Sequence, residues 1–274
     1  MRKIAFIGVG NMAGAIINGA LRSGALEPSS LILTDLYPSQ CAPYVALGAQ
    51  AVPTPADAAG SADCIVLSVK PQNFPEILPS LASVEGIEDK LIISIAAGIS
   101  TDTIRQALGD VPVVRVMPNT PMLIGMGVSA LCVTPNVTAE DFALARSLFE
   151  ASGSVMIINE SDMNSIISVT GSSPAYVFDF ISAIHQAAVA QGLSDENLLP
   201  CICDVVIGSA TLLKSGLQAG GLSPEDQIRR VTSKGGTTEQ AMRVLADRDF
   251  HGVIMDAMLA CTARAEEMGK QTKN

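Results

Sequence analysis

Residues 3–14 read KIAFIGVGNMAG, and this stretch decides the fold that the sequence predicts. The apolar run from Ile4 to Ile7 is typical of a fully buried strand, and it breaks at Gly8 into a glycine-rich loop. Gly8 suits a tight bend, Gly10 suits a close approach of the backbone to a pyrophosphate, and the small residues that follow suit a helix packed on the strand. Because phosphates bind to the free N–H groups at a helix N-terminus, the stretch predicts a dinucleotide-binding turn.

The second predicted strand, residues 31–34, ends at Asp35. An acid at this place accepts hydrogen bonds from the ribose hydroxyls of the cofactor and repels a 2′-phosphate, so Asp35 favours NADH. The alternative is that Asp35 only caps the turn at residues 36–39. No arginine follows closely enough to hold a 2′-phosphate, but use of both cofactors stays open.

Strands and helices alternate through the first half of the chain. Further strands are expected at residues 50–52, 64–69, 91–95, 113–117, 128–133 and 155–158. The alternation predicts an α/β fold with a Rossmann-type doubly wound parallel sheet, and it leaves the order of the last two strands open.

Three places at the carboxyl ends of these strands are candidates for ligand contacts, because ligands bind at that edge of such a sheet. Lys70 suits a phosphate or a ribose, and the small residues 96–98 leave room for a flat ring. Asn119 suits the nicotinamide amide or the substrate. A solvated strand end for Lys70 and simple turn chemistry for Asn119 are the alternatives.

The second half of the chain changes character at about residue 160, where the strand pattern stops. Long helices are expected at residues 174–191, 197–214 and 252–269. We therefore divide the chain into a dinucleotide-binding Rossmann domain, residues 1–160, and an all-helical dimerisation and substrate domain, residues 161–274. The helix at 197–214 is apolar nearly all round, and its apolar length falls short of the roughly 20 residues that a membrane span needs. We expect a second copy of the chain to cover it.

Residues 231–239 read VTSKGGTTE and follow a short helix with Ser223 as its expected cap. Two glycines among hydroxyl residues at the start of a helix predict a small anion cradle, in which the N–H groups of residues 236–239 and the hydroxyls face one point. A carboxylate fits this cradle. A glycine hinge with an N-cap threonine is the alternative.

Composition limits the partners of the chain. A net charge of −10 argues against a nucleic acid and against an anionic membrane surface. The six cysteines include no Cys-x-x-Cys pair and only two histidines could join them, so no metal site is expected. Free thiols and the absence of a signal-peptide pattern before the first predicted strand predict a cytoplasmic location.

Six stretches, in order along nearly the whole chain, resemble the pyrroline-5-carboxylate reductases: IGVGNM (7–12), VKPQ (69–72), SIAAG (94–98), MPNTP (117–121), TGSSPAY (170–176) and SKGGTT (233–238). The resemblance implies an oxidoreductase that transfers hydride from NADPH or NADH to the imine carbon of 1-pyrroline-5-carboxylate. The product would be L-proline, in the last step of proline biosynthesis. It also implies interlocked homodimers that assemble into a decamer, a pentamer of dimers.

The resemblance and the residue patterns together give a set of candidate site residues. The cofactor-binding candidates are Ile7, Gly8, Val9, Gly10, Asn11, Met12, Asp35, Val69, Lys70, Pro71, Ala97 and Asn119. The substrate-binding candidates are Glu160, Ser233, Gly236, Thr237 and Thr238, and Thr238 is also the catalytic candidate because its counterpart reaches the ring nitrogen. The chain departs from the family pattern at Lys234, where proline is usual, and at Arg230, where some relatives have asparagine.

Two other functions fit parts of the pattern. A dehydrogenase of 3-hydroxyacids shares the two-domain plan, but it uses a lysine on the long helix, and residues 174–191 contain none. A cofactor-sensing protein that has lost the reaction would not need the hydroxyl-rich loop at 233–238.

A protonated cyclic imine is already an electrophile, so positioning beside the nicotinamide accounts for a site with few acids and bases.

Overall fold

The computed structural model describes residues 2–271 and divides into two compact units. The first unit holds the chain up to Pro174 together with the stretch from Leu259 onward, and the second holds Ala175–Met258. The predicted succession of an α/β half and a helical half is confirmed.

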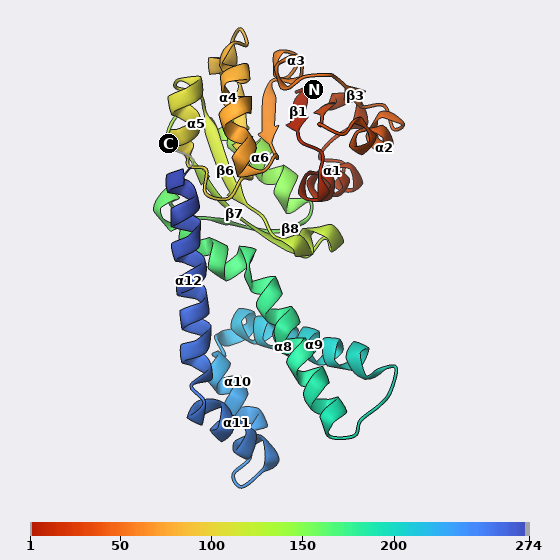
Figure 1. Cartoon of the computed structure of the whole chain (residues 1–274). Coiled ribbons are helices and arrows are strands. Elements are labelled where there is room, and N and C mark those ends of the chain that lie inside the picture. Colours follow the sequence, from red (N-terminus) through yellow and green to blue (C-terminus); the bar gives the residue numbers. More distant parts are fainter. Residues whose placement is uncertain (1, 272–274) are drawn as a thin grey trace. The chain divides into compact units, whose positions relative to one another are not determined.

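One sheet of eight strands forms the centre of the first unit, in the order β3-β2-β1-β4-β5-β6-β7-β8 (Figure 1). The strands are β1 (Ile4–Ile7), β2 (Leu31–Thr34), β3 (Gln50–Ala51), β4 (Cys64–Leu67), β5 (Leu91–Ser94), β6 (Val113–Met117), β7 (Gly127–Val133) and β8 (Gly153–Ile157). The first six in spatial order pair in parallel, which confirms the doubly wound fold. The order places β1 between β2 and β4, at the point where the chain switches direction across the sheet and where such folds bind ligands.

The sheet is not parallel throughout, because β7 runs antiparallel to β6. Only residues 118–126 join these two strands. A parallel pair needs a crossover of about a dozen residues or more, usually with a helix, so a linker of this length turns the chain back on itself. β8 then pairs in parallel with β7 after a helical crossover.

Helices cover both faces of this sheet. In the first unit they are α1 (Asn11–Ser23), α2 (Ala42–Val45), α3 (Pro55–Gly60), α4 (Phe74–Ala82), α5 (Thr101–Leu108), α6 (Ala139–Glu150) and α7 (Met163–Ile166), and α7 continues into a π-helical turn, η7 (Ile167–Gly171). The buried clusters put α1 and α6 on one face and α4 and α5 on the other.

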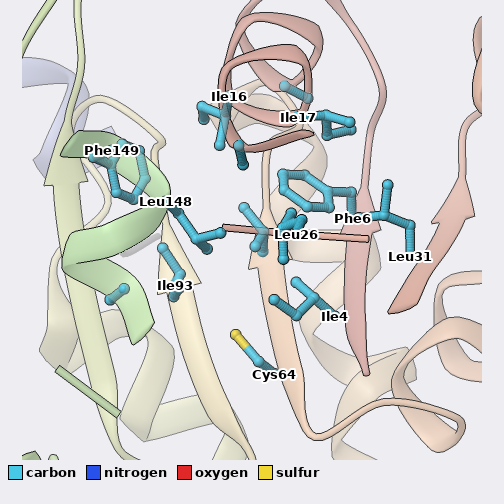
Figure 2. Close-up of a cluster of buried hydrophobic side chains, with 14 of the residues drawn as sticks. Ile4, Phe6, Ile16, Ile17, Leu26, Leu31, Cys64, Ile93, Leu148 and Phe149 are labelled. Atoms are coloured by element: carbon cyan, nitrogen blue, oxygen red, sulfur yellow. The ribbon is translucent and has the colours of Figure 1, made fainter. Parts of the chain in front are cut away.

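The core on the α1 and α6 face is built from alternate residues of the central strands. Figure 2 shows Phe6 of β1 close to Ile16 and Ile17 of α1, with Leu148 and Phe149 of α6 in the same cluster. All five side chains are at most 1% exposed. Burial of a side chain of this size contributes about 1.5–3 kcal/mol, so this cluster fixes α1, and with it the glycine turn, against the sheet.

The second unit is helical. Helix α8 (Ser173–Ala190) leads into it, and α9 (Leu198–Gly220), α10 (Pro224–Val231) and α11 (Thr237–Asp247) lie within it. Helix α12 (Phe250–Gln271) begins there and ends in the first unit. Ser223 caps α10 as expected, within a capping box that Asp226 completes.

Helix α9 corrects one expectation. It continues past Lys214 to Gly220, and its stretch Leu198–Gln218 is long and apolar enough to cross a membrane by length and composition. The expected end at residue 214 was wrong because the apolar pattern resumes after Lys214, at Leu217. Only 6% of the apolar window is buried within this chain, so the helix presents a broad apolar surface that needs a cover.

Candidate functional site

The glycine turn closes tightly at Gly8. The residue has φ +91°, and a Cβ atom there would lie 2.9 Å from Cγ1 of Val69 and 3.0 Å from the backbone oxygen of Ser68. A side chain is therefore excluded both by the backbone conformation and by the neighbouring strand end. The hydroxyl of Ser68 lies 2.6 Å from the carbonyl oxygen of Gly8, to which it donates, and it was missed as a site residue. A hydroxyl at the end of a strand beside the turn is the sequence feature that could have found it.

The space above Gly10 is open. Gly10 is the N-cap of α1, makes no side-chain cap, and a Cβ atom on it would meet no atom of the described chain within 4 Å. The next amides, those of Asn11 and Met12, stand in the first turn of a 13-residue helix, where the helix itself provides no acceptor. Free N–H groups and the positive end of the helix dipole favour a phosphate here, so the turn fits the pyrophosphate of a dinucleotide.

Asp35 lies at the end of β2, beside this turn. Its carboxylate accepts hydrogen bonds from the backbone N–H of Val9 at 2.6 Å and from that of Tyr37 at 2.8 Å. The alternative predicted from the sequence, a capped turn after the strand, is thus present. The bond to Val9 is additional, and it ties Asp35 to the glycine turn.

The ends of β4 and β5 bring further candidates to the same edge of the sheet. Lys70 is exposed and directly precedes Pro71, and Val69 packs against Gly8. Ala97 is half-buried in the loop after β5. Parallel register places the ends of β1, β2, β4 and β5 in one row, so the structure gathers the predicted cofactor residues from 7–12, 35, 69–71 and 97 along one edge.

Asn119 has a different position from these residues. It is buried, its amide nitrogen donates to the carbonyl oxygen of Thr170 at 3.0 Å, and its amide oxygen accepts from the N–H of Val128 at 2.8 Å. The side chain therefore joins the end of β6 to β7 and to η7. A contact with the cofactor stays a prediction, and it would have to use the second amide hydrogen or the backbone.

Glu160 is part of a polar network in the first unit. One carboxylate oxygen accepts from the buried guanidinium of Arg115 at 2.7 Å and from the N–H of Thr101 at 3.2 Å, and the other accepts from the thiol of Cys132 at 2.8 Å. Burial, and then the neighbouring carboxylate of Glu160, raise the pKa of Cys132, so the thiol stays protonated as a donor. Sequence reasoning missed this network, because Arg115 and Cys132 stand inside apolar strand patterns.

The hydroxyl-rich loop belongs to the second unit. The amide of Gly236 donates to the carbonyl oxygen of Ser233 at 3.0 Å, and the amide of Gly235 donates to the carboxylate of Glu239 at 2.7 Å. The prediction that the amides of residues 236–239 are all free for an anion is therefore wrong at Gly236, because the amide of Gly236 already donates to Ser233 within the turn. The amides of Thr237, Thr238 and Glu239 remain in the first turn of the 11-residue helix α11, where the helix provides no acceptor.

The first-turn amides of α11 and the adjoining hydroxyls can hold a small anion such as a carboxylate. Thr238 is half-buried at the second helical position. Within residues 2–271, no group of three or more His, Cys, Asp or Glu side chains is arranged to hold a metal ion.

Two family models match the chain. Residues 160–268 match a model described as pyrroline-5-carboxylate reductase dimerisation, and residues 3–98 match one described as NADP oxidoreductase coenzyme F420-dependent.

Curated relatives are similar over almost the full length. The pyrroline-5-carboxylate reductase of Vibrio alginolyticus is 38% identical and covers 98% of each chain. That of Escherichia coli K12 is 36% identical and covers 98% of this chain and 99% of the relative.

Solved structures are similar in the same way. A pyrroline-5-carboxylate reductase from Coxiella burnetii is 31% identical, with a TM-score of 0.87 and coverage of 97% of this chain and 98% of that one. The Plasmodium falciparum pyrroline carboxylate reductase, crystallised with NADP bound, is 25% identical, with a TM-score of 0.85 and coverage of 98% of each chain.

Proposed function

The chain belongs to the pyrroline-5-carboxylate reductase family, and from this premise we propose how its residues reduce 1-pyrroline-5-carboxylate to L-proline with NADPH or NADH. The chain is an oxidoreductase of proline biosynthesis. The observation that carries the proposal is the pair of helix N-termini described above. One lies at the glycine turn of α1 and suits a pyrophosphate, and one lies at α11 and suits a carboxylate.

The residues at the carboxyl edge of the sheet would hold the cofactor. The first-turn amides of α1 would bind the pyrophosphate, Asp35 would accept from the adenosine ribose, Lys70 would add a positive charge, and the loop of Ala97 would leave room for the nicotinamide ring. When bound, the reduced nicotinamide supplies a hydride to the imine carbon. The protein's task is to hold the two reacting atoms in a near-attack geometry.

The substrate carboxylate binds to the amides and hydroxyls of the loop from Ser233 to Thr238. The hydroxyl oxygen of Thr238 accepts a hydrogen bond from the protonated ring nitrogen, which orients the imine and keeps it electrophilic. After hydride transfer the nitrogen is an amine, and it takes a proton from solvent. The resemblance also implies that Glu160 lies near the substrate. In this structure its carboxylate pairs with Arg115, and 37% of its side chain stays accessible. We propose that Glu160 contacts the substrate only through this accessible part.

Steady-state kinetics test this function. The purified full-length protein is supplied with the cyclic imine and with each reduced nicotinamide, and the loss of nicotinamide absorbance is followed. We expect Thr238→Ala to lower kcat by about 10- to 100-fold, the effect of one hydrogen bond to a charged group, while cofactor affinity stays within about threefold. Thr232→Ala is the matched control, because its hydroxyl donates to the carbonyl oxygen of Ile228 in the preceding helix.

Two outcomes would count against the proposal. Unchanged turnover in Thr238→Ala removes Thr238 from the mechanism. Tight binding of the cofactor without any oxidation by the imine would identify a cofactor sensor instead of a reductase.

The helical part of the chain forms a homodimer, which is what the dimerisation model over residues 160–268 describes. Exposed apolar side chains on α9 support a partner copy as its cover: Val205 is 66% exposed, Ile207 58% and Leu212 60%. Burial against an identical surface satisfies them without a membrane. We propose further that five dimers form a decamer, and light scattering after size-exclusion chromatography distinguishes the dimer from the decamer by mass.

We propose a cytoplasmic location for the enzyme. All six cysteines are free thiols in the structure, as suits a reducing compartment. Fractionation of cells that express the protein tests this: activity in the soluble cytoplasmic fraction is expected, and activity in a membrane fraction would contradict it.

A further inference from the structure

The carboxylate of Asp35 is held in place by two backbone hydrogen bonds. Both of its carboxylate oxygens are engaged by backbone amides, one from Val9 in the glycine turn and one from Tyr37 after the strand. The turn is itself joined to β2, because the amide of Gly8 donates to the carbonyl oxygen of Thr34 at 2.9 Å. The carboxylate cannot turn away from the cofactor edge without leaving two amides unpaired, at a cost in free energy.

The stretch of sequence around Asp35 carries no lysine or arginine that could offset its charge. Residues 23–69, which include β2, β3 and β4 and all their connections, contain neither lysine nor arginine. The charge of Asp35 acts on the thiol of Cys41. Burial, and then the negative charge of Asp35, raise the pKa of this thiol and keep it neutral. The next lysine, Lys70, follows β4, which is two strands away from β2 across β1, or about 10 Å at the usual strand spacing.

We propose that this chain selects NADH over NADPH as its reductant, and that Asp35 is the residue that sets the preference. The inference rests on the proposed function and deepens it, since the fold and the family accept either cofactor. The remaining lone pairs of the Asp35 carboxylate accept hydrogen bonds from the ribose hydroxyls of NADH. A 2′-phosphate would replace one of these donors by a group with a charge of about −1.5 to −2, next to a fixed carboxylate and without a cation to bind it.

The test is a binding measurement on the full-length protein, made without substrate. Fluorescence titration gives the dissociation constants of NADH and NADPH for the wild type and for Asp35→Ser and Asp35→Asn. We expect the wild type to bind NADH at least tenfold more tightly than NADPH, which corresponds to about 1.4 kcal/mol. In Asp35→Ser we expect the ratio to fall below about threefold.

The measured quantity is the ratio of the dissociation constants of NADPH and NADH. Loss of the hydrogen bond from Val9 to Asp35 weakens the binding of both cofactors by the same factor, so this loss by itself leaves the ratio unchanged. Asp35→Asn keeps the shape of the side chain and removes its charge, and it also replaces one of the two acceptor oxygens by an amide donor, so one of the two backbone amides loses its partner. The same fall in the ratio is expected there. Glu27→Gln is the control. It removes one negative charge from an exposed residue before β2, at the opposite edge of the sheet, and should leave the ratio unchanged.

Equal affinity of the wild type for the two cofactors would overturn the inference, and so would an unchanged ratio in both Asp35 variants. These failures are distinct from failure of the proposed function. A protein that binds both cofactors equally and oxidises them with the imine refutes only the preference. A protein that prefers NADH but never oxidises it refutes only the reaction.

Discussion

The two glycines of the turn at residues 8–10 should respond to the same substitution in opposite ways. In Gly8→Ala the new methyl group would lie 2.9 Å from Cγ1 of Val69 and 3.0 Å from the backbone oxygen of Ser68, in a residue with φ +91°. In Gly10→Ala the methyl group would meet no atom of the described chain within 4 Å, in a residue with φ −76°. The first change disturbs the protein, and the second fills the space assigned to the pyrophosphate.

The sizes of the two effects follow from this geometry. The positive φ of Gly8 costs an alanine about 1–2 kcal/mol, and the steric overlap adds about 1–3 kcal/mol. Together these lower the melting temperature of a unit of this size by roughly 4–20 °C. Gly10→Ala loses a few tenths of a kcal/mol as a poorer N-cap and regains a similar amount from the stiffer unfolded chain, so the melting temperature should change by less than about 2 °C.

Calorimetry and cofactor titration on both variants test this pair. We expect Gly8→Ala to melt well below the wild type, and Gly10→Ala to melt with the wild type but to bind NADH at least about tenfold more weakly, since a methyl group displaces a phosphate from its amides. Normal NADH affinity in Gly10→Ala would refute the assignment of that space. Normal stability in Gly8→Ala would refute the steric argument for the turn.

Two further substitutions test the supports of the turn and of the sheet. Ser68→Ala removes the donor to the carbonyl oxygen of Gly8, so we expect a loss of about 1 kcal/mol in calorimetry and a cofactor affinity several-fold weaker; unchanged values in both would contradict the role of the hydroxyl. Burial raises the pKa of Asp141, but hydrogen bonds from Thr138 and Arg2 outweigh it and leave that pKa lowered. The lowered pKa of Asp141 stabilises the folded state above the unfolded value of about 4, and this stabilisation is lost as the pH falls through the lower folded value. The free energies of unfolding of wild type and Asp141→Asn, from urea titrations, should therefore differ by about 1–2 kcal/mol at pH 7, and the difference should shrink as the pH falls below 4. A difference that does not change between pH 7 and pH 3 would contradict this.

Much of the first unit could be predicted from the sequence, because its strands are buried on both faces and stand out as short apolar runs between glycine loops. The direction of β7 could not be read in this way. Its residues look like those of any other buried strand, and only the short linker at 118–126 determines that it runs antiparallel. The length of this linker, which is too short for a parallel crossover, is the feature of the sequence that could have predicted the direction of β7.

The candidate site was predictable where the chemistry is local and was missed where it depends on distant contacts. Gly8, Gly10 and Asp35 follow from a single strand–loop–helix pattern and its distance to the next strand end. The bond from Arg115 to Glu160 joins residues 45 positions apart, and no local pattern announces it. Such long-range pairs determine which polar side chains already have a partner in the folded protein, and local sequence motifs do not contain this information.

Transfer of an isotope tests the central claim most directly, namely that the chain delivers hydride from a bound nicotinamide to the imine carbon. The protein is given NADH deuterated at the transferable position and 1-pyrroline-5-carboxylate, and the product is examined by mass spectrometry and NMR. We predict L-proline with one deuterium, on the ring carbon next to nitrogen that was the imine carbon, and a rate that falls with Thr238→Ala but not with Thr232→Ala. Oxidation of the cofactor without deuterium at that carbon, or no proline at all, would contradict the account.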